Sequence, residues 1–211
     1  RIVVTGRGTE DPGTDLFADV VRVPTNAAAA GHLRDRIAAG AGVAEVETLM
    51  FVFASAAPDR HHLLLAYIAR TLAAGMSIAG DAADPVVRAV RRIRDRVSLE
   101  VARLLGFVRF RRIGGDRYYA PVRPDADIVG FIGPHFADRF PDQALVVHDV
   151  GRDVAFWSAG GARGIADLAG PPRLPRERLA KDIEPGIEDL WRAFFEQTAN
   201  PERRNRRLQR K

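Results

Sequence analysis

The sequence contains no cysteine and very little lysine. The absence of cysteine excludes disulfides, thiolate zinc sites, iron–sulfur clusters and cysteine nucleophiles. Of the 32 basic residues only Lys181 and Lys211 are lysines, and the other 30 are arginines. Arginine presents a rigid fork that suits phosphate oxygens, although the same bias also follows from a GC-rich genome. The arginine content therefore permits a phosphate-binding function without requiring one.

Long apolar runs and common catalytic motifs are also missing. The longest apolar stretches, such as residues 63–68, are far too short to cross a bilayer, and no secretory signal is visible. We therefore expect a cytoplasmic protein that does not contact membranes. There is no Walker loop, no His-Glu-x-x-His and no Gly-x-Ser-x-Gly, and Gly6-Arg7-Gly8 lacks the third glycine of a dinucleotide loop. We predict neither a cofactor nor a metal.

What is present is the composition of a soluble globular chain with an uneven charge. The 211 residues are 46% hydrophobic and 28% charged, and the sequence has no internal repeat. It opens at Arg1, and we expect it to be part of a longer protein. Residues 1–87 carry a net charge of −3, residues 88–117 +7, residues 118–200 −4 and residues 201–211 +5. Two basic blocks on a mildly acidic body indicate either a polyanion-binding surface or a solvated helix face with a charged tail.

The first half of the chain has helical spacing. We predict helices over residues 26–39, 43–55, 58–74 and 85–105, with Asn26 and Asp84 as N-caps and with Gly75 and Gly106 as stops. The last of these helices divides its residues between two faces. Its apolar stripe is Val86, Val90, Ile93, Val97, Val101 and Leu104, and its basic face is Arg88, Arg92, Arg96 and Arg103.

The second half mixes strand and helix patterns. The sequence predicts a β-hairpin formed by residues 107–113 and 117–122. It also predicts a helix over residues 127–139, interrupted near Gly133-Pro134. A second strand pair is predicted at residues 144–150 and 154–158. Residues 159–186 resemble a long loop or linker, and residues 187–199 a last amphipathic helix. The predicted fold class is α+β, an N-terminal helical part followed by a small antiparallel sheet with flanking helices.

We expect one α+β domain over residues 26–200, with a helical part at 26–105 and a sheet-containing part at 106–200. Residues 1–25 form an extended N-terminal segment in this prediction. Residues 201–211 form a basic tail or linker.

One polar constellation could carry chemistry. His135 and Arg139 are one helical turn apart, and His148-Asp149 stands at a strand end. Such a group suits acid–base catalysis, a phosphate clamp or a metal site. The alternative is that His148 is a buried, hydrogen-bonded histidine and that Arg139 pairs with Asp142 to close the helix. The candidate catalytic residues are His135, His148 and Asp149.

Other residues are candidates for nucleic-acid contact. Arginines of the long helix, the hairpin and the tail would bind phosphates, and aromatic rings of the hairpin, Phe110 among them, would stack on bases. The candidates are Arg88, Arg92, Arg96, Arg109, Arg111, Arg112, Arg117, Tyr118, Tyr119, Arg139, Arg203, Arg204, Asn205 and Arg207.

Several motifs occur together in one order. They are Gly106-Phe-Val-Arg-Phe, Tyr118-Tyr119-Ala120-Pro, the block from Pro134 to Gln143, Val147-His148-Asp149 and Pro201-Glu-Arg-Arg-Asn205. With them, residues 40–211 resemble a bacterial domain-of-unknown-function family of DNA repair or DNA metabolism proteins. The resemblance implies a setting beside a radical-SAM DNA repair protein or fused to a uracil-DNA glycosylase-type domain. It implies no established activity, and a radical-SAM partner would have to bring the iron–sulfur cluster.

Three functions are therefore compatible with the sequence. The first is a DNA repair accessory domain that binds DNA through arginine-rich surfaces. The second is a hydrolase or base-directed DNA repair enzyme that uses His135, His148 and Asp149. The third is a protein-interaction module that docks a glycosylase or radical-SAM partner.

Overall fold

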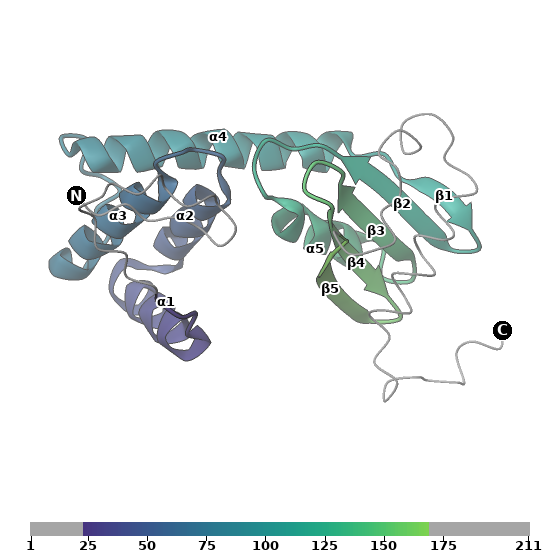
Figure 1. The fold of residues 1–211 in the computed structure, drawn as a ribbon, viewed down its shortest axis with the longest axis horizontal. Helices are drawn as coiled ribbons and strands as arrows, with labels where there is room; N and C mark the ends of the chain where they lie inside the picture. Colours follow the sequence, from purple (N-terminus) through teal and green to yellow (C-terminus); the bar gives the residue numbers. More distant parts are fainter. Residues whose placement is uncertain (1–22, 169–211) are drawn as a thin grey trace, which may run out of the picture. The chain divides into compact units, whose positions relative to one another are not determined.

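A computed structural model describes residues 23–168 (Figure 1), and the chain divides into two compact units, Arg1–Glu100 and Val101–Lys211. Residues 1–22 of the predicted extended N-terminal segment, with the loop at Gly6-Arg7-Gly8, lie outside the described residues, as do the predicted helix at residues 187–199 and the basic tail. Helices precede a sheet that has one helix among its strands, so the predicted α+β class is confirmed. None of the helices in the described part is long and apolar enough to span a bilayer.

The first unit contains α1 (Ala27–Ala41), α2 (Val43–Ala54), α3 (Arg60–Ala74) and most of α4 (Pro85–Phe107). Three of the predicted helix ends, at Asn26, Gly75 and Asp84, are confirmed by their caps. The Asn26 side chain accepts a hydrogen bond from the Ala29 amide at 2.9 Å, and Asp84 Oδ1 accepts one from the Val86 amide at 2.7 Å. Gly75 ends α3 with a left-handed φ of 66°, which glycine adopts without steric cost.

A buried carboxylate is held inside this helical unit. Glu45 of α2 accepts hydrogen bonds from the Tyr67 hydroxyl (2.8 Å), the Ser77 hydroxyl (3.3 Å) and the Ile78 amide (3.4 Å). Burial, followed by the hydrogen bond to Glu45, raises the pKa of Tyr67, so its hydroxyl stays protonated and donates. These donors offset the cost of burying Glu45 and tie α2, α3 and the following loop together. The surrounding apolar core is Val52, Leu63, Leu64, Tyr67, Val87 and Val90.

The second unit contains a five-stranded sheet in the order β1-β2-β3-β4-β5. The strands are β1 (Arg111–Gly114), β2 (Arg117–Val122), β3 (Ala144–Asp149), β4 (Val154–Ala159) and β5 (Ala162–Asp167). The sheet is mixed and not purely antiparallel as predicted, because β2 and β3 pair in parallel while the other neighbours are antiparallel. The reason is α5 (Val129–Arg139), which lies between β2 and β3 in sequence and returns the chain to the end where β2 began.

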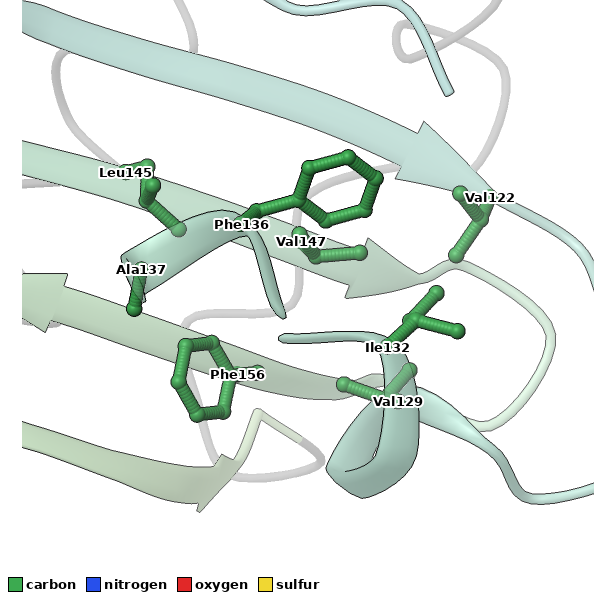
Figure 2. Close-up of a cluster of buried hydrophobic side chains, with 8 residues drawn as sticks. All are labelled: Val122, Val129, Ile132, Phe136, Ala137, Leu145, Val147 and Phe156. Atoms are coloured by element: carbon green, nitrogen blue, oxygen red, sulfur yellow. The ribbon is translucent and has the colours of Figure 1, made fainter. Parts of the chain in front are cut away.

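Helix α5 packs on one face of the sheet and forms the core of the second unit with it. Figure 2 shows Ile132 and Phe136 of α5 directed toward Val147 and the strands beside it. The helix continues through Pro134, which corrects the predicted interruption. Pro134 costs one backbone hydrogen bond, and burial of apolar side chains on both sides of it outweighs that loss. The buried cluster is Val122, Val129, Ile132, Phe136, Ala137, Leu145, Val147 and Phe156.

Two further boundaries differ from the sequence predictions. Helix α4 continues through Gly106 to Phe107, because Leu104 and Leu105 pack against the core and hold the last turn in place. The predicted loop at 159–186 contains β5, which pairs with β4 after a turn at Gly160 (φ 57°) and Gly161 (φ 78°). A Gly-Gly pair between two extended segments is a hairpin signal, because both central positions of such a turn require positive φ.

Candidate nucleic-acid interface

The predicted basic face of α4 in the first unit is reduced by internal contacts. Arg88 donates through Nη1 to the carbonyls of Ala82 (2.9 Å) and Ala83 (2.7 Å), so it anchors the loop that precedes the helix. Arg92 and Arg96 are exposed and have no hydrogen-bond or ion-pair partner among the described residues. These two arginines are therefore the guanidinium groups that this face offers to an anion.

A second group of arginines lies in the other unit, at the end of α4 and on the β1–β2 hairpin. Residues 101–123 contain six arginines and a single acidic residue, Asp116. All six arginines are exposed. We give the name basic surface to five of them, which lie on the end of α4 and on the hairpin but do not all share one face, because Arg111 and Arg112 are adjacent in β1: Arg103, Arg109, Arg111, Arg112 and Arg117.

The members of the basic surface differ in how strongly they are held. Arg112 donates through Nε to the Gly115 carbonyl and lies 3.6 Å from Asp116, so it supports the hairpin turn. Within the described part of the chain, Arg109 makes two long contacts and no others, both from Nη1, to the carbonyls of Gly106 and Val108 at 3.4 Å. Arg103 and Arg111 have no partner among the described residues, so their whole forks are available to a ligand.

Of the rings predicted to stack on bases, one is buried and two are partly buried. Tyr119 is 0% exposed, and Tyr118 packs against the core of the second unit. Phe110 makes edge contacts with Phe136 (5.1 Å between ring centres) and Phe140 (6.3 Å). The assignment of Tyr119 as a stacking ring is therefore wrong, and the rings of Tyr118 and Phe110 are both used in packing.

His135 and Arg139 share the outer surface of α5, as their spacing predicted. Both are exposed, and the Arg139 guanidinium lies 5.8 Å from the centre of the Phe140 ring. The neighbouring Asp138 forms an ion pair with Arg163 of β5 at 2.8 Å. Arg139 thus remains a candidate phosphate contact.

His148 lies on the other face of the sheet from α5. Leu145 and Val147 of β3 point toward α5, and side chains alternate along a strand, so His148 points away from it. It is buried, and its Nδ1 lies 2.8 Å from the Tyr119 hydroxyl. The alternative of a buried, hydrogen-bonded histidine is therefore confirmed. The structure does not bring His135 and His148 together.

Burial lowers the pKa of His148, and the nearby Asp153 and Asp149 carboxylates oppose this shift. Nε2 of the ring lies 3.9 Å from Asp153 Oδ1, which is too long for a hydrogen bond. The folded state disfavours the imidazolium form of His148. The contribution of this residue to stability is therefore complete above the unfolded-state pKa of about 6.5. It declines as the pH falls below that value, because the unfolded protein then takes up the proton more readily.

We expect the His148→Gln variant to lose part of the pH dependence of stability. In the wild type, the free energy of unfolding should fall as the pH drops from 6.5 to 5.5, with His148 contributing at most about 1.4 kcal/mol per pH unit. Urea denaturation at a series of pH values measures both slopes. If the free energy of unfolding changed equally with pH in the variant and the wild type, His148 would have the same pKa in the folded and the unfolded protein, and the prediction would be wrong.

Asp149 is fully occupied by internal contacts. Its Oδ1 accepts hydrogen bonds from the amides of Gly151 (2.9 Å) and Arg152 (3.2 Å), and its Oδ2 pairs with Arg152 Nη1 at 2.8 Å. Arg152 also donates to the Pro124 and Asp125 carbonyls after β2. This pair therefore fastens the carboxyl ends of β2 and β3. Within residues 23–168, no group of three His, Asp or Glu side chains is placed to hold a metal ion.

Comparison with known families identifies most of the chain. Residues 58–211 match a domain of unknown function, DUF4130. The chain belongs to this family. The match starts just before α3, so the DUF4130 region includes the basic surface, while α1 and α2 precede it. No curated protein and no solved structure matches the chain.

Proposed function

We propose that this DUF4130 protein is a DNA repair accessory domain that binds DNA phosphates through the basic surface. The observation that carries the proposal is the charge between residues 101 and 123, where six exposed arginines accompany one acidic residue. Arg103 and Arg111 have no acceptor among the described residues, so a bound phosphate would not have to displace an internal partner. The resemblance drawn from the motifs supplies the DNA repair setting.

Two other basic segments support the same function. Arg92 and Arg96 of the first unit are exposed, without acceptors among the described residues. The tail carries Arg203, Arg204 and Arg207 with Asn205, and it lies outside the described part of the chain. Contacts of this kind release counterions from DNA and are independent of base sequence, so we expect non-specific, salt-dependent binding.

The enzymatic alternative has less support. Its three residues do not form one cluster, because His135 is exposed on α5 while His148 is buried on the far face of the sheet. Asp149 is already saturated by two amides and Arg152. A hydrolase or base-directed role would need these groups to rearrange first.

The test is fluorescence anisotropy with labelled DNA across a salt series. We expect the affinity to fall steeply with salt, and the double variant Arg103→Ala/Arg111→Ala to bind about 10-fold or more weakly at low salt. Loss of two phosphate contacts should also reduce the slope of log K against log salt by about 1.4 for single strands.

The matched control is Arg34→Ala/Arg163→Ala. It removes the same charge, but from exposed arginines that already pair with Asp35 and Asp138 at 2.8 Å. We expect this control to bind almost as the wild type does. Equal losses in both double variants would mean that net charge and not the basic surface drives binding. Negligible binding of the wild type at low salt would refute the proposal and favour the protein-docking alternative.

A further inference from the structure

One exposed aromatic ring lies between two members of the basic surface, Arg103 and Arg109, along the chain. Phe107, the last residue of α4, is 70% exposed, although its neighbours Leu105 and Val108 pack against the core of the second unit. Within residues 23–168, nothing lies within 4 Å of the position that a Cβ on the preceding residue, Gly106, would occupy, so α4 is also uncovered there. A large apolar side chain in this position gains little from the packing of the described fold, because most of its surface stays in contact with water.

Two arginines lie near Phe107 along the chain, one on each side. Arg103 precedes Phe107 by one helical turn, which places the two side chains side by side on the outer face of α4. Arg109 follows two residues later, and its Nη1 contacts the carbonyls on either side of Phe107, those of Gly106 and Val108. Because Nη1 makes both contacts, the other nitrogens of this guanidinium keep donors for a phosphate.

We infer that Phe107 is a base-stacking platform and that the preferred ligand of the basic surface is single-stranded nucleic acid. This inference rests on the proposed function, and it specifies which form of nucleic acid the basic surface prefers. In a duplex the faces of the bases are covered by their neighbours, so an exposed ring finds no partner there. In a single strand each base offers a free face, and a base stacked on Phe107 brings its phosphates within reach of Arg103 and Arg109.

The other aromatic rings of the second unit that the sequence offered for base stacking are not available for it. Tyr118, Tyr119 and Phe110 are engaged in packing. Among the described residues, the other strongly exposed phenylalanine is Phe53 in α2, at 64% exposed, and its ring makes an edge contact with His61. Phe53 belongs to the first unit, outside the basic surface, and is therefore a matched control.

The experiment measures the affinity of the whole chain for oligo(dT) and for a duplex of equal length at low salt. We expect Phe107→Ala and Phe107→Leu to weaken oligo(dT) binding by about 5- to 150-fold, the range that one stacked base supplies. Duplex binding should change by less than about 2-fold, because the arginines remain. Phe107→Trp should keep the affinity, and its added fluorescence should be quenched when oligo(dT) binds. Phe53→Ala should bind both ligands as the wild type does.

The outcomes separate the inference from the proposed function. If the wild type binds both ligands in a salt-dependent way and both Phe107 variants bind like it, stacking is refuted while phosphate binding stands. If Phe107→Ala weakens both ligands equally, or if Phe107→Trp shows no quenching, the ring supports the surface and does not contact bases. If the wild type binds neither ligand, the proposed function fails and the inference fails with it.

Discussion

Replacement of Gly133 by alanine is expected to destabilise the second unit by about 3 kcal/mol, the upper end of typical overpacking penalties. A Cβ at this position of α5 would lie 2.1 Å from Cγ and 2.6 Å from Cβ of Phe156, which is in the buried core. These atoms lie close to the backbone of β4, so the ring cannot simply swing aside. Denaturation followed by tryptophan fluorescence, to which Trp157 of β4 contributes, measures the loss.

The control for this prediction is the same substitution at Gly106 of α4. A Cβ there meets no described residue within 4 Å, and alanine favours the helix over glycine by about 0.5 to 1 kcal/mol. We therefore expect Gly106→Ala to be neutral or slightly stabilising. If Gly133→Ala were equally harmless, α5 would not approach β4 as closely as described.

The Asp149→Asn variant is expected to lose about 2 to 3 kcal/mol of stability. Asp149 is 0% exposed, and in the variant an amide hydrogen would face the Arg152 guanidinium in place of a carboxylate oxygen at 2.8 Å. Breaking a buried ion pair costs about 3 to 5 kcal/mol, and the effect should be smaller here because the Arg152 side chain is 32% exposed. Urea denaturation at neutral pH measures the loss.

Asp116→Asn provides the comparison, because it removes a carboxylate from an exposed pair with Arg112 at 3.6 Å. Exposed pairs contribute about 1 kcal/mol or less, so this variant should stay close to the wild type. Equal effects at both positions would contradict the view that Asp149 and Arg152 fasten the ends of β2 and β3. If Asp149→Asn loses this much stability, an inactive Asp149→Asn variant would not show that Asp149 is catalytic, because the loss of folded protein would explain the inactivity.

The position of the basic surface along the chain was predictable from the sequence. Which of its arginines are held by internal hydrogen bonds and which are not was not predictable. The charge count placed a basic block at residues 88–117. It gave no means to separate Arg88, which is bonded to two carbonyls, from Arg103, which has no partner among the described residues. Those contacts depend on the path of the loop before α4 and of the hairpin after it.

The aromatic residues were the least predictable part of the site. Phe107 and Phe110 stand three residues apart in similar surroundings, yet Phe107 is exposed and Phe110 packs against α5. The difference arises because α4 continues through Gly106, and that continuation depends on the packing of Leu104 and Leu105. A glycine near a helix end predicts a stop only when nothing distant holds the next turn.

Local chemistry determined the helix starts and the hairpin turns, because these signals act over a few residues. Asn26 and Asp84 bond amides within three positions of themselves, and glycine supplies the backbone angles that the turns need. The parallel pairing of β2 with β3, the edge strand β5 and the separation of His135 from His148 depended on the folded chain. They follow from where α5 lies on the sheet, and its position is set by apolar contacts between residues distant in sequence.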